Sequence, residues 1–192
     1  MSYKQEFQTV DLILASNAET LGVDAFALSL IKCERQIRRL LTHIVFQYPC
    51  FGSADISELR SLLSSNRRVY FEGFLRGFDA IYPRSIRDLI GESHDPLRLR
   101  LDEAIDYRNK IFHGQLTSKW LTRQALVEYV ADVRYWCRVL GDAALAEIYY
   151  DGFARDSFRK SEGERIWERF KIELTGVNDY EQFIRQHMQR PS

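Results

Sequence analysis

The chain has 192 residues, a length that suits one globular domain with or without a tail. Apolar residues make up 45 % and charged residues 28 %, which excludes an intrinsically disordered chain. With only 4 prolines and 10 glycines, turns are scarce, and a many-stranded sandwich or barrel is disfavoured. The net charge is zero and by itself predicts no polyanionic partner. Arginine outnumbers lysine 21 to 6, either through the codon bias of a GC-rich genome or because guanidinium groups bind phosphate.

The N-terminal sequence MSYKQEFQTVDLIL lacks the charged and then apolar layout of a signal peptide. No stretch approaches the roughly 18 apolar residues that a membrane helix needs. Cys33, Cys50 and Cys137 cannot all pair with one another, and their spacing is not that of metal ligands. Free thiols are typical of a reducing compartment. We therefore expect a cytoplasmic protein with no metal, no cofactor and no membrane contact.

Apolar residues recur at helical spacing through the first half of the chain. Pro49 ends the first long helix. Asp55, with Glu58 three residues later, has the pattern of a capping box and opens the next helix. The helices expected in this half cover residues 23–48, 55–63, 69–82 and 84–90.

Two longer helices are expected in the second half. Asp95 followed by Pro96 is the pattern of a cap and a first helical residue, and that helix continues to Gly114. Thr122 opens the next helix, which extends to about Tyr150.

The composition becomes strongly charged after Gly152. We expect one amphipathic helix within ARDSFRKSEGERIWERFKIEL and a short last helix from Asp179 to about Met188. This tail either packs on the main bundle or forms a partner-binding arm. The predicted fold is all-α, a four- to five-helix bundle over residues 23–152 with an N-terminal segment, 1–22, and additional C-terminal helices in a tail, 153–192.

Two charged residues fall on helix faces that are otherwise apolar. Glu34 shares its face with Leu30 and Ile37, and Arg108 shares its face with Leu101 and Phe112. Burying one unpaired charge costs roughly several kcal/mol, so we expect Glu34 and Arg108 to form an ion pair between their two helices. The pair could be purely structural, or one long side chain could reach out to water instead.

The helix that carries Arg108 also has a polar stripe. Asp102, Asp106, Asn109 and His113 follow one another at spacings of four, three and four residues, and so line one face. The simplest interpretation is a solvated face that ends at Gly114.

The segment Arg108-Asn-Lys-Ile-Phe-His113 resembles the R-x4-H motif of the HEPN superfamily, whose members are helical bundles and include many metal-independent ribonucleases. The surrounding DYRNKIFHGQ contains both the R-N pair and the H-G ending that occur in that family. The motif lies near the end of its helix, another long helix follows, and the first long helix has an acidic residue on its inner face. The resemblance covers residues 20–152.

This resemblance implies RNA cleavage by attack of the ribose 2′-OH on the adjacent phosphate, with 2′,3′-cyclic phosphate and 5′-OH ends. His113 would be the general acid/base and Arg108 the phosphate clamp. Asn109 would orient the imidazole or hold a phosphate oxygen, and Glu34 would hold Arg108, with Asp106 as a second supporting residue. The family commonly dimerises so that two motifs share one cleft, and we expect a homodimer.

The implied protein is a toxin or phage-defence effector, with RNA as its substrate and an antitoxin or regulatory protein as a possible partner. In some related toxins a tyrosine two residues after the histidine is modified by a partner, whereas this chain has Gln115. Two alternatives stay open. The chain could be an inactive HEPN-like module that binds a nucleotide or a protein, or an unrelated helical interaction protein in which the motif arose by chance.

Overall fold

The computed structural model describes residues 2–66, 68–117, 121–154, 156–161 and 165–190. These residues form an all-helical protein without a strand, and the one isolated bridge among them joins Val69 to Gln189. The all-α prediction is confirmed. The α-helices are α1 (Tyr3–Leu14), α2 (Leu21–Gln47), α3 (Ile56–Ser65), α4 (Phe71–Ile81), α5 (Ile86–Ile90), α6 (His94–Phe112), α7 (Arg123–Ile148) and α8 (Val177–Phe183).

Four short helical turns complete the description. Three of them are 3-10 turns, and the last is a π-helical turn that continues α8. They are η1 (Ser53–Asp55), η2 (Gly91–Ser93), η3 (Ile166–Arg169) and η4 (Ile184–Met188).

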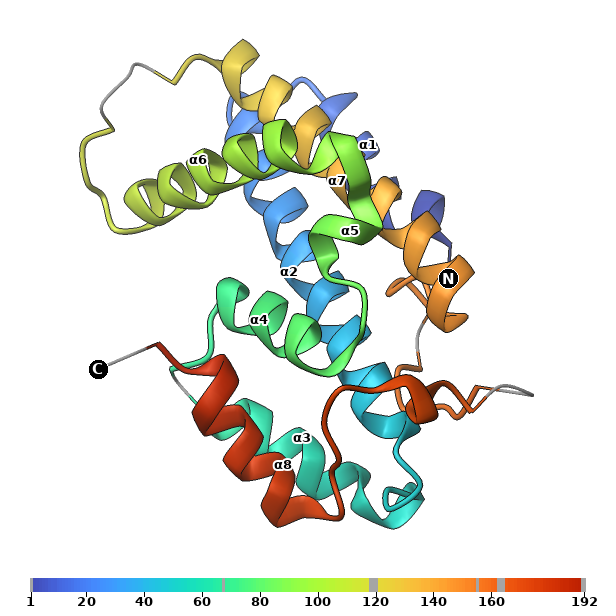
Figure 1. The fold of residues 1–192 in the computed structure, drawn as a ribbon. Coiled ribbons are helices and arrows are strands. Elements are labelled where there is room, and N and C mark those ends of the chain that lie inside the picture. Colours follow the sequence, from blue (N-terminus) through green and yellow to red (C-terminus); the bar gives the residue numbers. More distant parts are fainter. Residues whose placement is uncertain (1, 67, 118–120, 155, 162–164, 191–192) are drawn as a thin grey trace.

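Helix α2 is the central element of the fold (Figure 1). It packs along α7 and also contacts α1, α4 and α6. The apolar stripe predicted for this helix is buried, with Leu30, Ile37 and Leu41 at most 1 % exposed. Figure 1 shows α6 and α7 on one side of the middle of α2 and α3, α4 and α8 on the other.

Most predicted helix ends are confirmed. Gly91 and Gly114 have positive φ values of 68° and 63°, which only glycine adopts easily, and each lies at the end of a helix. Thr122 caps α7 by accepting the N–H of Ala125 at 3.2 Å. Helix α7 continues through Ile148, as expected.

Two predicted side-chain caps do not form. Asp55 is the N-cap residue of α3, as predicted, but its carboxylate accepts the N–H of Gly52, three residues earlier, so it closes η1 and makes no capping bond to α3. Asp95 lies inside the first turn of α6, and its carboxylate pairs with Arg87 and with the ring of His94. In both cases a nearby donor competes for the carboxylate that the local pattern assigned to the helix N-terminus.

The expected amphipathic helix after Gly152 is also wrong. Among the residues described there, the helical structure is the short turn η3, and parts of the expected helix, 155 and 162–164, lie outside the described residues. Phe170, Ile172 and Leu174 alternate at a spacing of two, which is the period of extended chain. The last helix, by contrast, is present as α8 and η4.

The tail packs on the bundle. Ile166, Leu174 and Met188 are buried in the same core cluster as the helices of the bundle. The guanidinium of Arg76 on α4 donates to the carbonyl oxygens of His187, Met188 and Gln189. The packed alternative for the tail is therefore confirmed, and it places η4 and Gln189 beside α4.

The N-terminal segment is also part of the core. Phe7 and Val10 of α1 are fully buried in that cluster, and the carboxylate of Glu6 binds Lys32 of α2 at 3.1 Å. Cys33, Cys50 and Cys137 are free thiols. Within the described part of the chain, no helix has both the length and the apolar character needed to cross a membrane.

His43 lies in the core between α2 and the end of α7. Its Nε2 lies 3.2 Å from the carbonyl oxygen of Ile148, and its ring stacks on Tyr150 with the centroids 4.6 Å apart. Burial lowers the pKa of His43 from 6.5 to about 4, in spite of the opposing carbonyl contact. A structural role fits this position.

We expect His43 to make the fold sensitive to acid. Between about pH 6.5 and about pH 4 the unfolded chain binds a proton here and the folded protein does not, so the free energy of unfolding falls as the pH drops. The full loss is on the order of 3 kcal/mol. Urea titrations across this range should show a smaller fall for His43→Gln than for the wild type. Equal falls would contradict the assignment.

Candidate functional site

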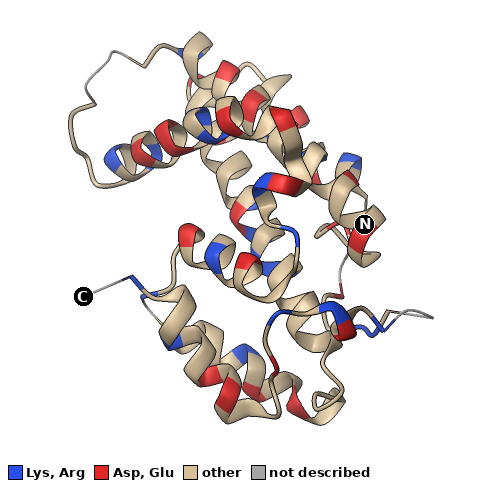
Figure 2. Ribbon diagram, viewed as in Figure 1, with Lys and Arg blue, Asp and Glu red and all other residues tan. Residues whose placement is uncertain are grey.

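A groove with a volume of about 1200 Å³ lies between α2, α3, α4 and α6. We call it the arginine groove, because seven arginines line it against three carboxylates, those of Glu34, Glu72 and Asp102. Such a concave basic surface attracts anions even when the net charge of the protein is zero. The arginines are Arg35, Arg38, Arg39, Arg60, Arg98, Arg108 and Arg190. Figure 2 shows the acidic and basic residues mixed along α6.

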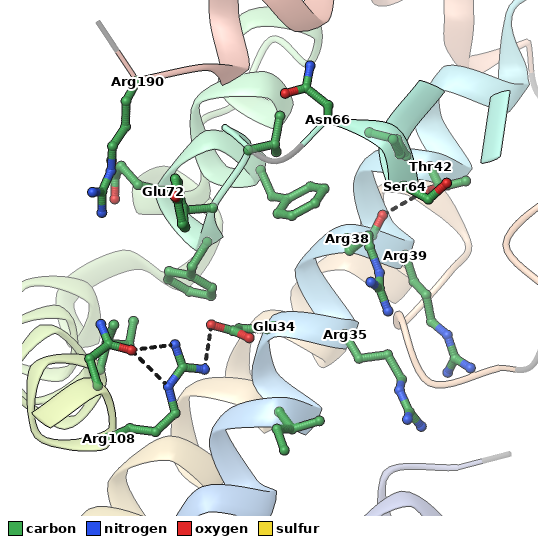
Figure 3. Close-up of a pocket in the computed structure, with 18 of the residues that line it drawn as sticks. Glu34, Arg35, Arg38, Arg39, Thr42, Ser64, Asn66, Glu72, Arg108 and Arg190 are labelled. Atoms are coloured by element: carbon green, nitrogen blue, oxygen red, sulfur yellow. Dashed lines mark hydrogen bonds and ion pairs between the residues drawn. The ribbon is translucent and has the colours of Figure 1, made fainter. Parts of the chain in front are cut away.

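The predicted pair of Glu34 and Arg108 is confirmed. The Nη1 of Arg108 on α6 donates to the Oε1 of Glu34 on α2 at 2.8 Å (Figure 3). The side chains are 17 % exposed for Arg108 and 33 % for Glu34. The apolar faces predicted that both side chains would be fully buried. They are only partly buried, because both line the groove. Arg108 is therefore fixed in position but still accessible from the solvent.

Asn109 has a different contact from the two that were predicted. Its Oδ1 accepts the Nε and Nη2 of Arg108 at 3.3 and 3.0 Å. The side chain thus holds the guanidinium, and among the described hydrogen bonds none joins it to the His113 imidazole. A guanidinium has five N–H groups. Three of them take part in these bonds, and no described hydrogen bond uses the other two.

His113 ends α6 at the border of the arginine groove. The N–H of Gly114 donates to the Ile111 carbonyl at 3.2 Å and the N–H of Gln115 to the Lys110 carbonyl at 2.8 Å. These two bonds form a Schellman motif. The motif ends the helix at Phe112, with His113 as the C-cap residue, and His113 is exposed.

The last turn of α6 stays regular. The N–H of His113 still donates to the Asn109 carbonyl at 3.0 Å. At 3.6 residues per turn, Arg108 and His113 therefore point about 140° apart around the helix axis, although both line the groove.

The two aspartates of the polar stripe have separate positions. Asp102 lines the groove and binds Arg98, which also binds Glu72 of α4. Asp106 is exposed, outside the groove lining, and pairs with Lys110 at 2.7 Å. Of the four stripe residues, Asp106 alone thus lies away from the groove. No described contact joins Asp106 to Arg108 or His113, so the structure does not support the supporting role expected for it.

Phe112 is another departure from the expected apolar face. Its side chain is 62 % exposed, and Leu116 in the following loop is 95 % exposed. Both residues are close neighbours of His113 in the sequence.

The basic wall opposite α6 was not predicted. Arg35, Arg38 and Arg39 lie within about one turn of α2, and all three line the groove. Figure 3 shows Glu34 directed toward Arg108, whereas the side chains of Arg35 and Arg39 extend away from Arg108. The available sequence signal was the run E-R-Q-I-R-R, with its arginines next to Glu34. That all three line one groove depends on how α1, α4 and α6 pack around α2, and the sequence pattern does not contain this information.

We expect Glu34→Ala to lower the free energy of unfolding by about 1–2 kcal/mol, between the values for exposed and buried pairs. The cause is the loss of the Arg108 partner in a half-buried position. Chemical unfolding measures this effect, with Glu92→Ala on the exposed turn η2 as the control. Unfolding identical to the wild type would show that the pair carries no stability.

No protein-family model matches this sequence, and neither a curated protein nor a solved structure matches the chain. The resemblance to the HEPN superfamily therefore rests on the residues of the segment 108–113 and on the arrangement around them.

Proposed function

We propose that this protein is a metal-independent endoribonuclease of the HEPN type that acts as a toxin or phage-defence effector. The observation that carries the proposal is the position of Arg108. It is held by Glu34 and Asn109 in the wall of a basic groove that His113 also borders.

The residues present match the chemistry of RNA transesterification. The ribose 2′-oxygen attacks the adjacent phosphorus while a base removes its proton, and the P–O5′ bond breaks as an acid protonates the leaving 5′-oxygen. Negative charge builds up on the non-bridging phosphate oxygens, where the two remaining N–H groups of Arg108 can donate. A neutral imidazole is a suitable base and an imidazolium a suitable acid, so His113 has the required chemistry.

A second copy of the chain supplies what one copy lacks. One histidine cannot remove a proton and donate another in the same step, and in a single chain Arg108 and His113 diverge around α6. In a two-fold dimer the motif of one protomer would face the motif of its partner. The exposed Phe112 and Leu116 beside His113 are suited to the centre of such an interface.

We expect the dimer to bury about 1,200 Å² or more in total and to be disrupted by Leu116→Asp. Leu116 is almost fully exposed, so the substitution should leave the fold intact. Sedimentation equilibrium should show at least about a tenfold weaker dimer, a loss of about 1.4 kcal/mol, with a parallel fall in cleavage. Leu145→Asp, at an exposed position on α7, is the matched control. A monomeric wild type with full activity would contradict the shared-cleft proposal.

The dependence on the 2′-hydroxyl tests the reaction itself. Purified protein is incubated in EDTA with a random-sequence RNA pool, with the matching DNA pool and with a 2′-O-methyl RNA pool. Cleavage of the RNA pool alone is expected, because the other two lack the attacking hydroxyl. Binding of the RNA pool without cleavage would favour the alternative, an inactive nucleotide-binding module.

A further inference from the structure

Arg38 is the central cation of the basic wall on α2. It lies one turn after Glu34 and between Arg35 and Arg39, and it lines the same groove as Arg108 of α6. Four residues of α-helix rise about 6 Å, so Arg38 and Glu34 are neighbours on the same face. The contact of Glu34 with Arg108 therefore lies beside Arg38.

The two arginines that flank Arg38 each have a carboxylate within ion-pair distance. Arg35 and Arg39 have the carboxylate of Glu6 at 3.3 and 4.0 Å. Among the described residues, no carboxylate forms an ion pair with Arg38. Partial burial and then the charges of Arg35 and Arg39 lower the pKa of its guanidinium, against a smaller opposing effect of the Glu34 carboxylate. The fold thus holds a cation in a position where an added anion would be stabilising.

The far end of the groove extends this basic surface. Arg60 of α3 lies over the ring of Phe158, with 4.8 Å between the guanidinium carbon and the ring centroid. Arg190 lies over Tyr70 at 4.3 Å, and Tyr70 is 49 % exposed. Alternating guanidinium groups and accessible aromatic rings are typical of surfaces that bind single-stranded nucleic acid, where the bases stack on the rings.

We propose that Arg38, flanked by Arg35 and Arg39, is a second phosphate-binding site in the groove, and that it holds a phosphodiester of the same single RNA strand whose scissile phosphate meets Arg108. The identity of the strand rests on the proposed function, whereas anion binding at Arg38 does not.

The size of the groove supports a strand over a single nucleotide. Pockets for small ligands usually have volumes of about 300–1,000 Å³, and this groove is larger. Two phosphate sites on opposite walls, α2 and α6, would also fix the direction in which the strand crosses Arg108. The enzyme would then prefer internal phosphodiesters to mononucleotides.

The test uses a fluorescent single-stranded 2′-O-methyl RNA, which has no free 2′-hydroxyl and cannot be cleaved by the proposed reaction. Its dissociation constant is measured by anisotropy over a range of salt concentrations for the wild type, Arg38→Ala, Arg108→Ala and the double variant. Arg138→Ala removes the same charge from an exposed position on α7 outside the groove and is the matched control. Circular dichroism checks the fold of each variant.

Arg38→Ala should weaken binding about tenfold or more, the usual effect of a charge-assisted hydrogen bond. The slope of log K against log salt should fall by about 0.7, the value for one phosphate of a single strand. The double variant should show additive losses, because the two arginines contact different phosphates. Arg138→Ala should bind like the wild type.

Two results would overturn the inference. One is an Arg38→Ala variant with the affinity and salt slope of the wild type. The other is a wild type that binds a phosphopeptide pool but not the RNA strand. Failure of the proposed function would give a different result. The wild type would bind the strand through Arg38 but would not cleave the random RNA pool, so the anion site would stand and the nuclease activity would be refuted.

Discussion

Arg108→Ala is expected to lower the rate of RNA cleavage by about 10²- to 10³-fold, the effect of removing one preorganised donor to a charge that develops in the transition state. The guanidinium is held by Glu34 at 2.8 Å and by Asn109 at 3.0 Å, so its direction is set before the RNA binds. Single-turnover cleavage at saturating enzyme measures the chemical step without the contribution of product release.

Arg108→Lys is the informative companion. A lysine keeps the charge, but an ammonium group cannot reproduce the planar fork that contacts Glu34, Asn109 and the phosphate together. We therefore expect no rescue of cleavage. Because Arg108 also binds Glu34, the unfolding of both variants has to be measured in parallel. Full activity of a well-folded Arg108→Lys protein would show that a point charge is sufficient. The proposed contact of two guanidinium N–H groups with the phosphate would then be refuted.

His113→Ala is expected to lower the rate by roughly 10²-fold or more, the usual scale of general acid–base catalysis. The side chain is exposed at the end of α6, and the Schellman motif that ends the helix uses backbone groups only, so the fold should not change. The same single-turnover assay applies.

His187→Ala is the matched control for this histidine. His187 lies in η4 beside the ring of Phe183, with the centroids 5.1 Å apart, and does not line the arginine groove. Its loss should leave cleavage unchanged. If a well-folded His113→Ala protein cleaves as fast as the wild type, His113 has no part in the reaction.

The pairing of Glu34 with Arg108 could be predicted because each is a charged residue at a position where the helical pattern calls for an apolar one. Glu34 and Arg108 are charged residues on apolar helix faces, and the cost of an unpaired charge left few places for them. The boundaries at Gly91, Gly114 and Thr122 were predictable for a similar reason, because each depends on backbone chemistry within a few residues.

Features that depend on tertiary packing were not predictable in this way. Asp55 and Asp95 have cap patterns, but other donors lie closer to their carboxylates in the folded chain. In the sequence, Arg38 is one of several arginines on the same helix. Its place in the groove depends on the packing of α4 and α6 against α2. The contact between Asn109 and Arg108 depends on side-chain rotamers, which residue spacing does not specify.

The chemical nature of the product ends tests the central proposal most directly. Purified protein is incubated with total RNA in EDTA, and the ends of the fragments are then identified. Attack by the 2′-hydroxyl at a site built from Arg108 and His113 predicts 2′,3′-cyclic phosphate and 5′-OH ends, at the same rate with and without EDTA, and their loss in His113→Ala. Fragments with 3′-OH and 5′-phosphate ends, or activity that EDTA abolishes and a divalent ion restores, would contradict it.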